Sequence, residues 1–254
     1  MFQGKKKAVT FSYDDGVLQD KRLIEILNKY GMKCTFNVNS GFLGKSGSLV
    51  REEVTVGHCK PRVCEVRDIY QGHEVAVHTI HHPRLTKLSA AKVVHEVEDD
   101  RKALSDIVGY DVVGMAYPCS TEASQDDRVV SLISRFTGVQ YARNTLETHD
   151  FEPQADLLRF RPTVHHTDWD DLFRLGEEFV SLQTDAPKIF YVWGHAYEFD
   201  IFNDWDKFED FCRLVSGKED IYYGTNKDVL LDADLLQYTG TKLHSFRKRK
   251  LFER

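Results

Sequence analysis

Short apolar runs recur along nearly the whole chain and are separated by amphipathic segments. The runs are rich in β-branched and aromatic residues, which is typical of strands buried on both faces of a parallel sheet. They are short enough for strands and are bounded by polar or turn-forming residues. The expected strands cover residues 7–13, 34–38, 73–78, 111–117, 139–142, 157–163, 188–193 and 221–223.

The segments between these runs carry apolar residues at helical spacing. The first of them is followed by Gly31, which is well suited to end a helix, and Ser89 is well placed to begin a later one. Residues 50–70 fit neither period, and we expect a longer irregular insertion there. The expected helices cover residues 19–30, 89–108, 126–136, 170–182, 205–215 and 227–238.

A strand followed by a helix, repeated about eight times, predicts a (β/α) barrel of seven to eight strands. We expect a single domain that covers residues 1–254. An open doubly wound sheet is the alternative. No GxGxxG or GxxxxGK[ST] motif follows an expected strand, so the nucleotide-binding versions of that alternative lose support.

Composition narrows the function classes. The hydrophobic fraction of 41% fits a packed globular domain, and the net charge of −6 argues against nucleic acid as a partner. The basic residues 5–7 and 247–250 are expected to be solvated ends. No apolar run is long enough to span a membrane. The start lacks a secretory signal, which favours a cytoplasmic location, with a removed leader as the alternative. Five cysteines without a CxxC pair also fit a reducing compartment.

Polar residues stand at the ends of several expected strands. The carboxyl ends of barrel strands meet on one rim, so these side chains are expected to converge. Two adjacent carboxylates, Asp14 and Asp15, are costly to bury unless a cation neutralises them, and Gly16 permits a sharp turn beyond them. The alternative is a polar turn that caps the next helix.

Three histidines follow the third expected strand. His78 and His82 are four residues apart, so in a helical turn their imidazoles point the same way, whereas His81 points elsewhere. Two histidines and a carboxylate form a catalytic site for Zn²⁺ or a similar divalent ion. Surface histidines on a loop are the alternative. His195 stands just past the seventh run, on the same rim, where it could serve as a general acid.

Together these segments resemble the polysaccharide deacetylase family, the NodB-homology domain of carbohydrate esterase family 4. The first two motifs of that family are specific, and the last two are only loosely so. The resembling segments are Thr10-Phe11-Ser12-Tyr13-Asp14-Asp15-Gly16, His78-Thr79-Ile80-His81-His82, Ala116-Tyr117-Pro118, Asp168-Trp169 and the segment ending in His195.

The resemblance implies a distorted (β/α) barrel and a role for each matched position. Asp14 would be the general base and His195 the general acid. Asp15, His78 and His82 would hold one divalent metal ion, most simply zinc, with cobalt, nickel or manganese as alternatives. The substrate would contact Tyr117, Pro118, Cys119 and Trp169, the last of these in the acyl pocket.

The third motif departs from the family pattern. Ala116 stands where the family has arginine, and Cys119 stands where it has an aromatic residue. The backbone N–H of Cys119 could still donate to an oxyanion. Arg143, at the end of the next expected strand, could supply the missing guanidinium and orient Asp14. The alternative for Arg143 is an ordinary surface arginine.

The resemblance implies a metal-dependent hydrolase that removes an N-acyl group, most simply acetyl, from an amino sugar or its polymer. Alternatives are a deformylase or amidase acting on a small or nucleotide-linked substrate, and hydrolysis of O-acetyl esters by the same residues. A carbohydrate-binding pseudoenzyme is a further alternative. Carbohydrate, or another small acyl amide, is the expected partner, and the oligomeric state is left open.

Overall fold

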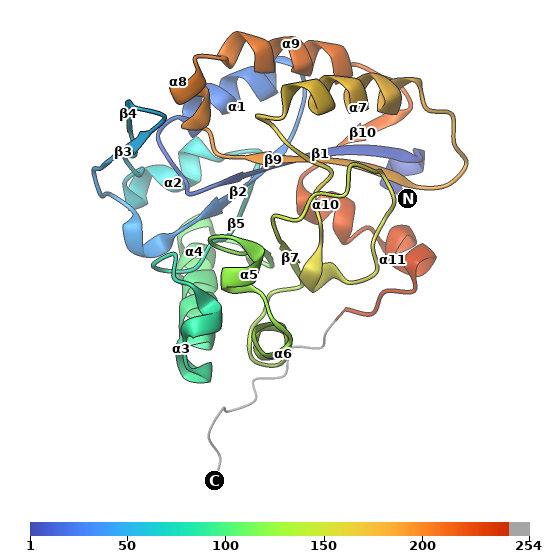
Figure 1. Ribbon diagram of the computed structural model, residues 1–254. Coiled ribbons are helices and arrows are strands. Elements are labelled where there is room, and N and C mark those ends of the chain that lie inside the picture. The colour runs from blue at the N-terminus through green and yellow to red at the C-terminus, as the bar shows by residue number, and fades with distance from the viewer. Residues whose placement is uncertain (244–254) are drawn as a thin grey trace.

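Eight parallel strands form one strongly curled sheet, which is the centre of the computed structural model (Figure 1). The structure describes residues 1–243. The order across the sheet is β7-β6-β5-β2-β1-β9-β8, and β10 pairs with β1. The strands are β1 (Lys7–Asp14), β2 (Cys34–Val38), β5 (Glu74–Val77), β6 (Gly114–Ala116), β7 (Tyr141–Arg143), β8 (Val164–His165), β9 (Lys188–Gly194) and β10 (Ile221–Tyr223).

The central strand β1 explains why this sequence forms a sheet buried on both faces. All eight of its residues are buried. One edge of β1 pairs with β9 from Lys7 to Tyr13, while the other edge pairs first with β10 and then with β2. Five of the strands expected from the sequence begin within one residue of an observed strand and end within one residue of it.

The two edges of the sheet are joined by an irregular segment, which makes the barrel a distorted one. Phe160 forms a parallel bridge with Arg143 of β7, and Thr163 donates its N–H to Tyr191 of β9 at 2.8 Å. The expected strand at residues 157–163 is therefore wrong. The segment begins with a 3₁₀ turn (Leu157–Arg159), and Pro162 has no N–H to donate to a ladder.

Most of the helices surround the outer face of the curled sheet, and their buried side chains belong to one hydrophobic cluster. In Figure 1, α1, α7 and α9 lie along one side, and α3, α4 and α6 lie on the other. The expected final helix is interrupted, because the Asp232 side chain accepts the N–H groups of Asp234 and Leu235 and begins a new helix. The helices are α1 (Asp20–Lys29), α2 (Val63–Ile69), α3 (Ala90–Val94), α4 (Asp100–Val108), α5 (Thr121–Ser124), α6 (Asp127–Phe136), α7 (Trp169–Ser181), α8 (Glu198–Phe202), α9 (Trp205–Val215), α10 (Asn226–Leu230) and α11 (Ala233–Thr239).

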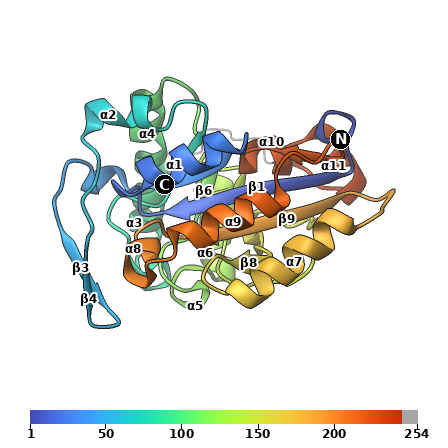
Figure 2. The same cartoon turned by 90° about the horizontal axis from the view of Figure 1, so that it is seen from above.

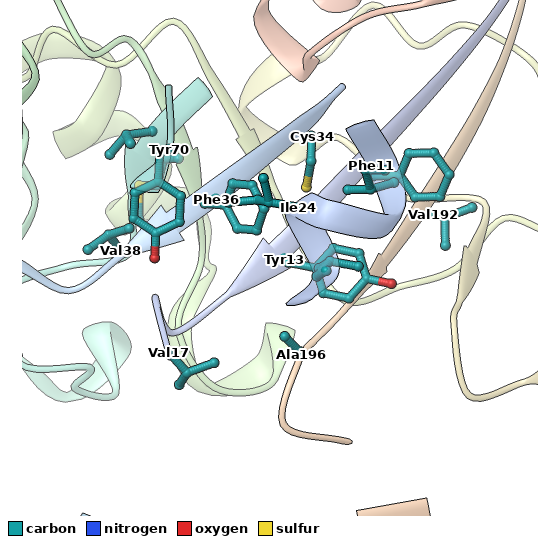
Figure 3. Close-up of a cluster of buried hydrophobic side chains, with 14 of the residues drawn as sticks. Phe11, Tyr13, Val17, Ile24, Cys34, Phe36, Val38, Tyr70, Val192 and Ala196 are labelled. Atoms are coloured by element: carbon teal, nitrogen blue, oxygen red, sulfur yellow. The ribbon is translucent and has the colours of Figure 1, made fainter. Parts of the chain in front are cut away.

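The main hydrophobic core lies between the sheet and its helices. Figure 3 shows Phe11, Tyr13 and Phe36 of the central strands beside Ile24 of α1. Burying a side chain of this size typically contributes about 1.5–3 kcal/mol, so this contact holds α1 on the strands whose ends carry the polar residues. The packed core therefore holds in place the strand ends that form the rim of the barrel.

Residues 50–70 are more regular than the sequence suggested. They contain most of an antiparallel hairpin, β3 (Ser48–Arg51) with β4 (Val54–Gly57), which projects from the body in Figure 2, and all of α2. The turn consists of Glu52 and Glu53, both at positive φ. Such turns usually carry Asn-Gly or Asp-Gly, so two glutamates gave no hairpin signal.

The sequence predicted that the lysines near the start are solvated, and this is wrong for one of them. Lys7 is buried, and its ammonium donates to the carbonyls of Phe179, Val180 and Leu182 near the end of α7. The basic run at 247–250 lies outside the described residues. Within residues 1–243, no helix has the length and apolarity needed to cross a membrane.

Candidate active site

Four strands carry polar side chains to one rim of the barrel. Asp14 ends β1, Arg143 ends β7, His78 follows β5 directly, and His195 follows β9 directly. A pocket of about 260 Å³ opens at this rim. It is lined by Asp14, Asp15, Arg51, His78, His82, Cys119, Ser120, Thr145, Trp193, His195 and Tyr197.

Asp14 is held by side chains from two other strands, the adjacent β2 and the more distant β7 across the barrel. Nη2 of Arg143 donates to both carboxylate oxygens, and Nδ2 of Asn37 donates to Oδ1 at 2.8 Å. Arg143 is fully buried, with its guanidinium 4.5 Å from the centre of the Trp193 ring, so it is not a surface arginine. One nitrogen bridges both oxygens, instead of the two-nitrogen fork that arginine often forms.

The surroundings of Asp14 favour its ionised form. Burial alone would raise the pKa of this carboxyl, but Arg143, through its positive charge and its hydrogen bond, brings the pKa below its usual value. Asp14 is therefore a carboxylate at neutral pH, oriented toward the pocket and able to accept a proton.

Asp15, His78 and His82 form a group of potential metal ligands. One ligand atom from each lies within 4.8 Å of the others. Oδ1 of Asp15 is 3.7 Å from Nε2 of His78 and 3.8 Å from Nε2 of His82. These separations suit donors arranged around a common ion with bonds of about 2.0–2.2 Å.

The two imidazoles meet through an irregular turn, so the expected helical turn is wrong. Thr79 and His82 both have positive φ, at 68° and 53°. The turn is fixed by Asn39, whose Nδ2 donates to the carbonyls of His78 and Thr79 at 2.6 and 2.9 Å. The Oγ1 of Thr79 also accepts the N–H of His82 at 3.1 Å. The rings of His78 and His82 therefore come together because of this irregular turn, and not because residues four apart share a helix face.

The donor atoms fit a divalent metal ion. The imidazole of His78 is 2.9 Å from the carbonyl of Ala116 through Nδ1, which leaves Nε2 facing Asp15. This Nε2 is buried and has no hydrogen-bond partner in the described chain. Burial lowers the pKa of His78 to about 4, so the ring is neutral at pH 7, as a metal ligand must be.

Asp15 is further supported by residues from the insertion. Nε2 of His58 lies 3.2 Å from its Oδ2, and the ammonium of Lys60 donates to its carbonyl oxygen at 2.6 Å. Burial would raise the pKa of Asp15, but the His58 hydrogen bond and the charge of Lys60 hold it well below the usual range. The carboxylate is thus ionised and directed toward the two histidines. Asp15 itself takes φ 77°, and Gly16 follows at φ 56°, which provides the sharp turn expected there.

His195 is held by Glu198, three residues further along. Oε2 of Glu198 accepts the backbone N–H of His195 at 3.0 Å and lies 3.2 Å from its Nδ1. Burial alone would lower the pKa of His195, yet the charge and hydrogen bond of Glu198 raise it to about 9. The imidazolium form is therefore favoured at neutral pH, with Nδ1 engaged by Glu198.

The four remaining predicted site residues are not all at this pocket. Cys119 lines it at φ 62°, with Sγ 3.6 Å from Nδ1 of His82. Tyr117 is buried and donates its hydroxyl to the carbonyl of Leu158, and neither it nor Pro118 is among the lining residues. Trp169 lines a separate pocket and donates its Nε1–H to Asp204 at 2.8 Å.

The sequence alone did not reveal several residues of the site. Asn37 had a signal, since it is a polar residue near the end of a buried strand. Arg51, His58 and Lys60 belong to the insertion, where no rule placed them near the rim. Glu198 lies in a short helix that the sequence did not predict, so only its spacing from His195 could have suggested it.

Comparison with known proteins agrees with this arrangement. The sequence profile described as "Polysaccharide deacetylase" matches residues 3–142, more than half of the chain. The peptidoglycan-N-acetylglucosamine deacetylase PgdA of Listeria monocytogenes is 26% identical over 106 residues. That match covers 41% of this chain and 20% of PgdA, so the chain spans about a fifth of this relative's length.

Solved structures share the fold at low sequence identity. The Xyl-CE4 domain of a multidomain xylanase from the hindgut metagenome of Trinervitermes trinervoides is 16% identical, with a TM-score of 0.57 over 95% of both chains. A family 4 carbohydrate esterase from Streptomyces lividans, in complex with acetate, is 14% identical with a TM-score of 0.53. That likeness covers 87% of this chain and 92% of the esterase. The expected distorted barrel is confirmed.

Proposed function

Because this chain belongs to the polysaccharide deacetylase family, we propose that it removes the N-acetyl group from an amino sugar or its polymer. The family consists of metal-dependent hydrolases that cleave N-acetyl amide bonds in carbohydrates. One observation carries the proposal for this chain: the carboxylate of Asp14 and the imidazole of His195 line the same pocket as the group of Asp15, His78 and His82.

We propose that Asp15, His78 and His82 hold one divalent ion, with zinc as the first choice and cobalt, nickel or manganese as alternatives. Two imidazoles and one carboxylate form a donor set that zinc accepts readily in hydrolases. A bound ion there would supply Lewis-acid polarisation of the acyl oxygen and a lower pKa for water.

The protein's own groups would carry the proton transfers. Asp14 would take the proton of the attacking water, and its contacts with Arg143 and Asn37 would keep it ionised and oriented. His195 would then protonate the departing nitrogen, since an amine leaves poorly unless it is protonated. The backbone N–H of Cys119, which donates to no other group within residues 1–243, is proposed to bind the developing oxyanion.

Substrate binding by Tyr117, Pro118 and Trp169 remains a prediction, with Tyr117 expected to act through the packing of the loop around Cys119. The cytoplasmic location also remains a prediction, and fractionation of the source cells tests it.

Acetate release from N-acetylated chito-oligosaccharides is the direct test of the proposed activity. We expect acetate from amino sugars to exceed formate from N-formyl sugars, acetate from O-acetyl esters and ammonia from simple amides. The opposite order would identify one of the other hydrolases, and binding of sugars without turnover of any substrate would indicate a pseudoenzyme.

Replacing Arg143 is expected to lower the rate and to move the acidic limb of the pH–rate profile to higher pH. Asp14 must be ionised to act as a base, and Arg143 is a main cause of its lowered pKa. Without that cation, burial raises the pKa, so Asp14 becomes protonated at a higher pH. The measurement is the pH–rate profile of Arg143→Ala and Arg143→Lys against the unchanged chain.

Arg143→Lys is the informative member of this pair. An ammonium keeps the charge but not the planar guanidinium, so the limb should move less than in Arg143→Ala while the rate still falls. Unchanged profiles and rates in both variants would show that Arg143 does not act on Asp14.

A further inference from the structure

A second cluster of metal-binding side chains lies beside the candidate active site. Oε2 of Glu198 lies 3.4 Å from Nε2 of His165, 3.1 Å from Nε2 of His166 and 3.2 Å from Nδ1 of His195. The same oxygen accepts the backbone N–H of His195 at 3.0 Å. Four nitrogens from the ends of β8 and β9 therefore surround one carboxylate oxygen.

More nitrogens surround this oxygen than it can accept hydrogen bonds from. A carboxylate oxygen has about two lone-pair sites, so four well-formed hydrogen bonds cannot end on it. The Nε2 of His166 is fully buried, is directed at Glu198 and makes no properly oriented hydrogen bond within the described chain. The Nδ1 of His165 lies 2.7 Å from the hydroxyl oxygen of Thr167, so the ring proton can sit on Nδ1 and leave Nε2 as an electron-pair donor that faces the cluster.

The separations match those within a metal shell. Donor atoms around a tetrahedral zinc ion with bonds of about 2.0–2.1 Å lie roughly 3.3 Å apart. The distances from Glu198 Oε2 to the three imidazoles are 3.1–3.4 Å. One donor atom each from His165, His195 and Glu198 also lies within 4.8 Å of the others.

We propose that His165, His195 and Glu198 form a second divalent metal site, with the buried Nε2 of His166 3.1 Å from the Glu198 carboxylate. It has no ligand in common with the group of Asp15, His78 and His82, although His195 lines the same pocket as that group. The bound ion would be zinc or another divalent ion that accepts two imidazoles and a carboxylate.

The second site should fill only at excess metal. An ion there must displace the contact between His195 Nδ1 and Glu198, together with the other contacts on the same oxygen. At the first site the Nε2 of His78 has no hydrogen bond to lose, and Asp15 Oδ1 is 3.7 Å away. Metal should therefore enter the Asp15 group first.

Filling the second site should inhibit the enzyme, a consequence that depends on the proposed function. A metal on Nδ1 of His195 takes the place of the proton that makes this ring an imidazolium. The neutral, metal-bound ring is a poor proton donor through Nε2, so the departing nitrogen is not protonated. Activity should rise up to one equivalent of zinc and fall as the second binds.

The test is a zinc titration of the purified full chain, with bound metal measured after equilibrium dialysis and acetate release measured in parallel. We expect two equivalents in the unchanged chain and one in His165→Gln, which should keep its activity but resist inhibition by excess zinc. His78→Ala should retain the weaker equivalent and be inactive. His95→Gln, which removes an exposed histidine on another face, is the matched control and should behave like the unchanged chain.

Metal stoichiometry separates this proposal from the proposed function, because it needs no substrate. A single equivalent in the unchanged chain, even at large zinc excess, would overturn the second site without any variant. A second equivalent that survives in His165→Gln would also overturn it. If two equivalents bind and His165→Gln loses one, the site stands even where no acetylated sugar is turned over.

Discussion

Replacing His78 or His82 with alanine is expected to leave the Asp15 group without its metal and to reduce deacetylation to background. Each variant removes one of three protein ligands from the group. Loss of an outer partner of a metal ligand typically weakens metal affinity or activity by about 10–100-fold, and loss of a ligand itself should exceed that. Metal analysis at one equivalent of zinc, with acetate release measured in parallel, checks the prediction.

His81→Ala is the matched control for these two variants. His81 lies in the same turn, but its side chain is 54% exposed and its Nδ1 lies 2.9 Å from Glu96, outside the ligand group. It should therefore keep both metal and activity. If His78→Ala and His82→Ala each bound the same amount of zinc as tightly as the unchanged chain, the ligand assignment would be wrong. The metal should also leave at low pH, because only neutral imidazole binds it.

The placement of the rim residues could be predicted because it follows from strand ends alone. Once a buried parallel strand is recognised, the residue at its carboxyl end is known to within one position. Asp14 and Arg143 are the last residues of β1 and β7, and they meet across the barrel. That meeting required only the strand order and the length of an arginine side chain.

The parts that the sequence did not predict depend on backbone shapes without a characteristic residue. The hairpin turn uses Glu52 and Glu53 at positive φ, and the turn at His78 places Thr79 and His82 there as well. These residue types adopt positive φ less readily than glycine or asparagine, so tertiary contacts such as those of Asn39 must fix them. Local propensity therefore pointed to other structures.

The residues that tune the site were also beyond sequence reasoning. Glu198 and His58 act through contacts with His195 and Asp15, not through a motif of their own. His58 reaches Asp15 from 43 positions away, and only the folded insertion brings them together. Such partners are recognised only from distances in the structure, because glutamate and histidine are also common on protein surfaces where they have no such role.

Asp14→Asn is expected to lower the turnover number about 10²–10⁴-fold, the usual contribution of a general base, while leaving metal content unchanged. Asparagine has nearly the same shape, yet it cannot accept the proton of the attacking water. Asp14 is not part of the ligand group, so the first equivalent of zinc should still bind. The measurement combines turnover at saturating substrate with metal analysis of the same sample.

Asp15→Asn is the contrasting variant, because the neighbouring carboxylate is the proposed ligand and its loss should release metal as well as activity. Asp14→Asn also leaves the buried Arg143 without its counter-charge, and breaking a buried ion pair typically costs about 3–5 kcal/mol. Its unfolding free energy should fall by an amount of this order, and retained zinc then serves as proof that the site is still assembled. If Asp14→Asn holds its zinc and turns over at nearly the unchanged rate, Asp14 has no part in the mechanism. If Asp14→Asn loses zinc and Asp15→Asn keeps it, the roles of the two carboxylates are exchanged.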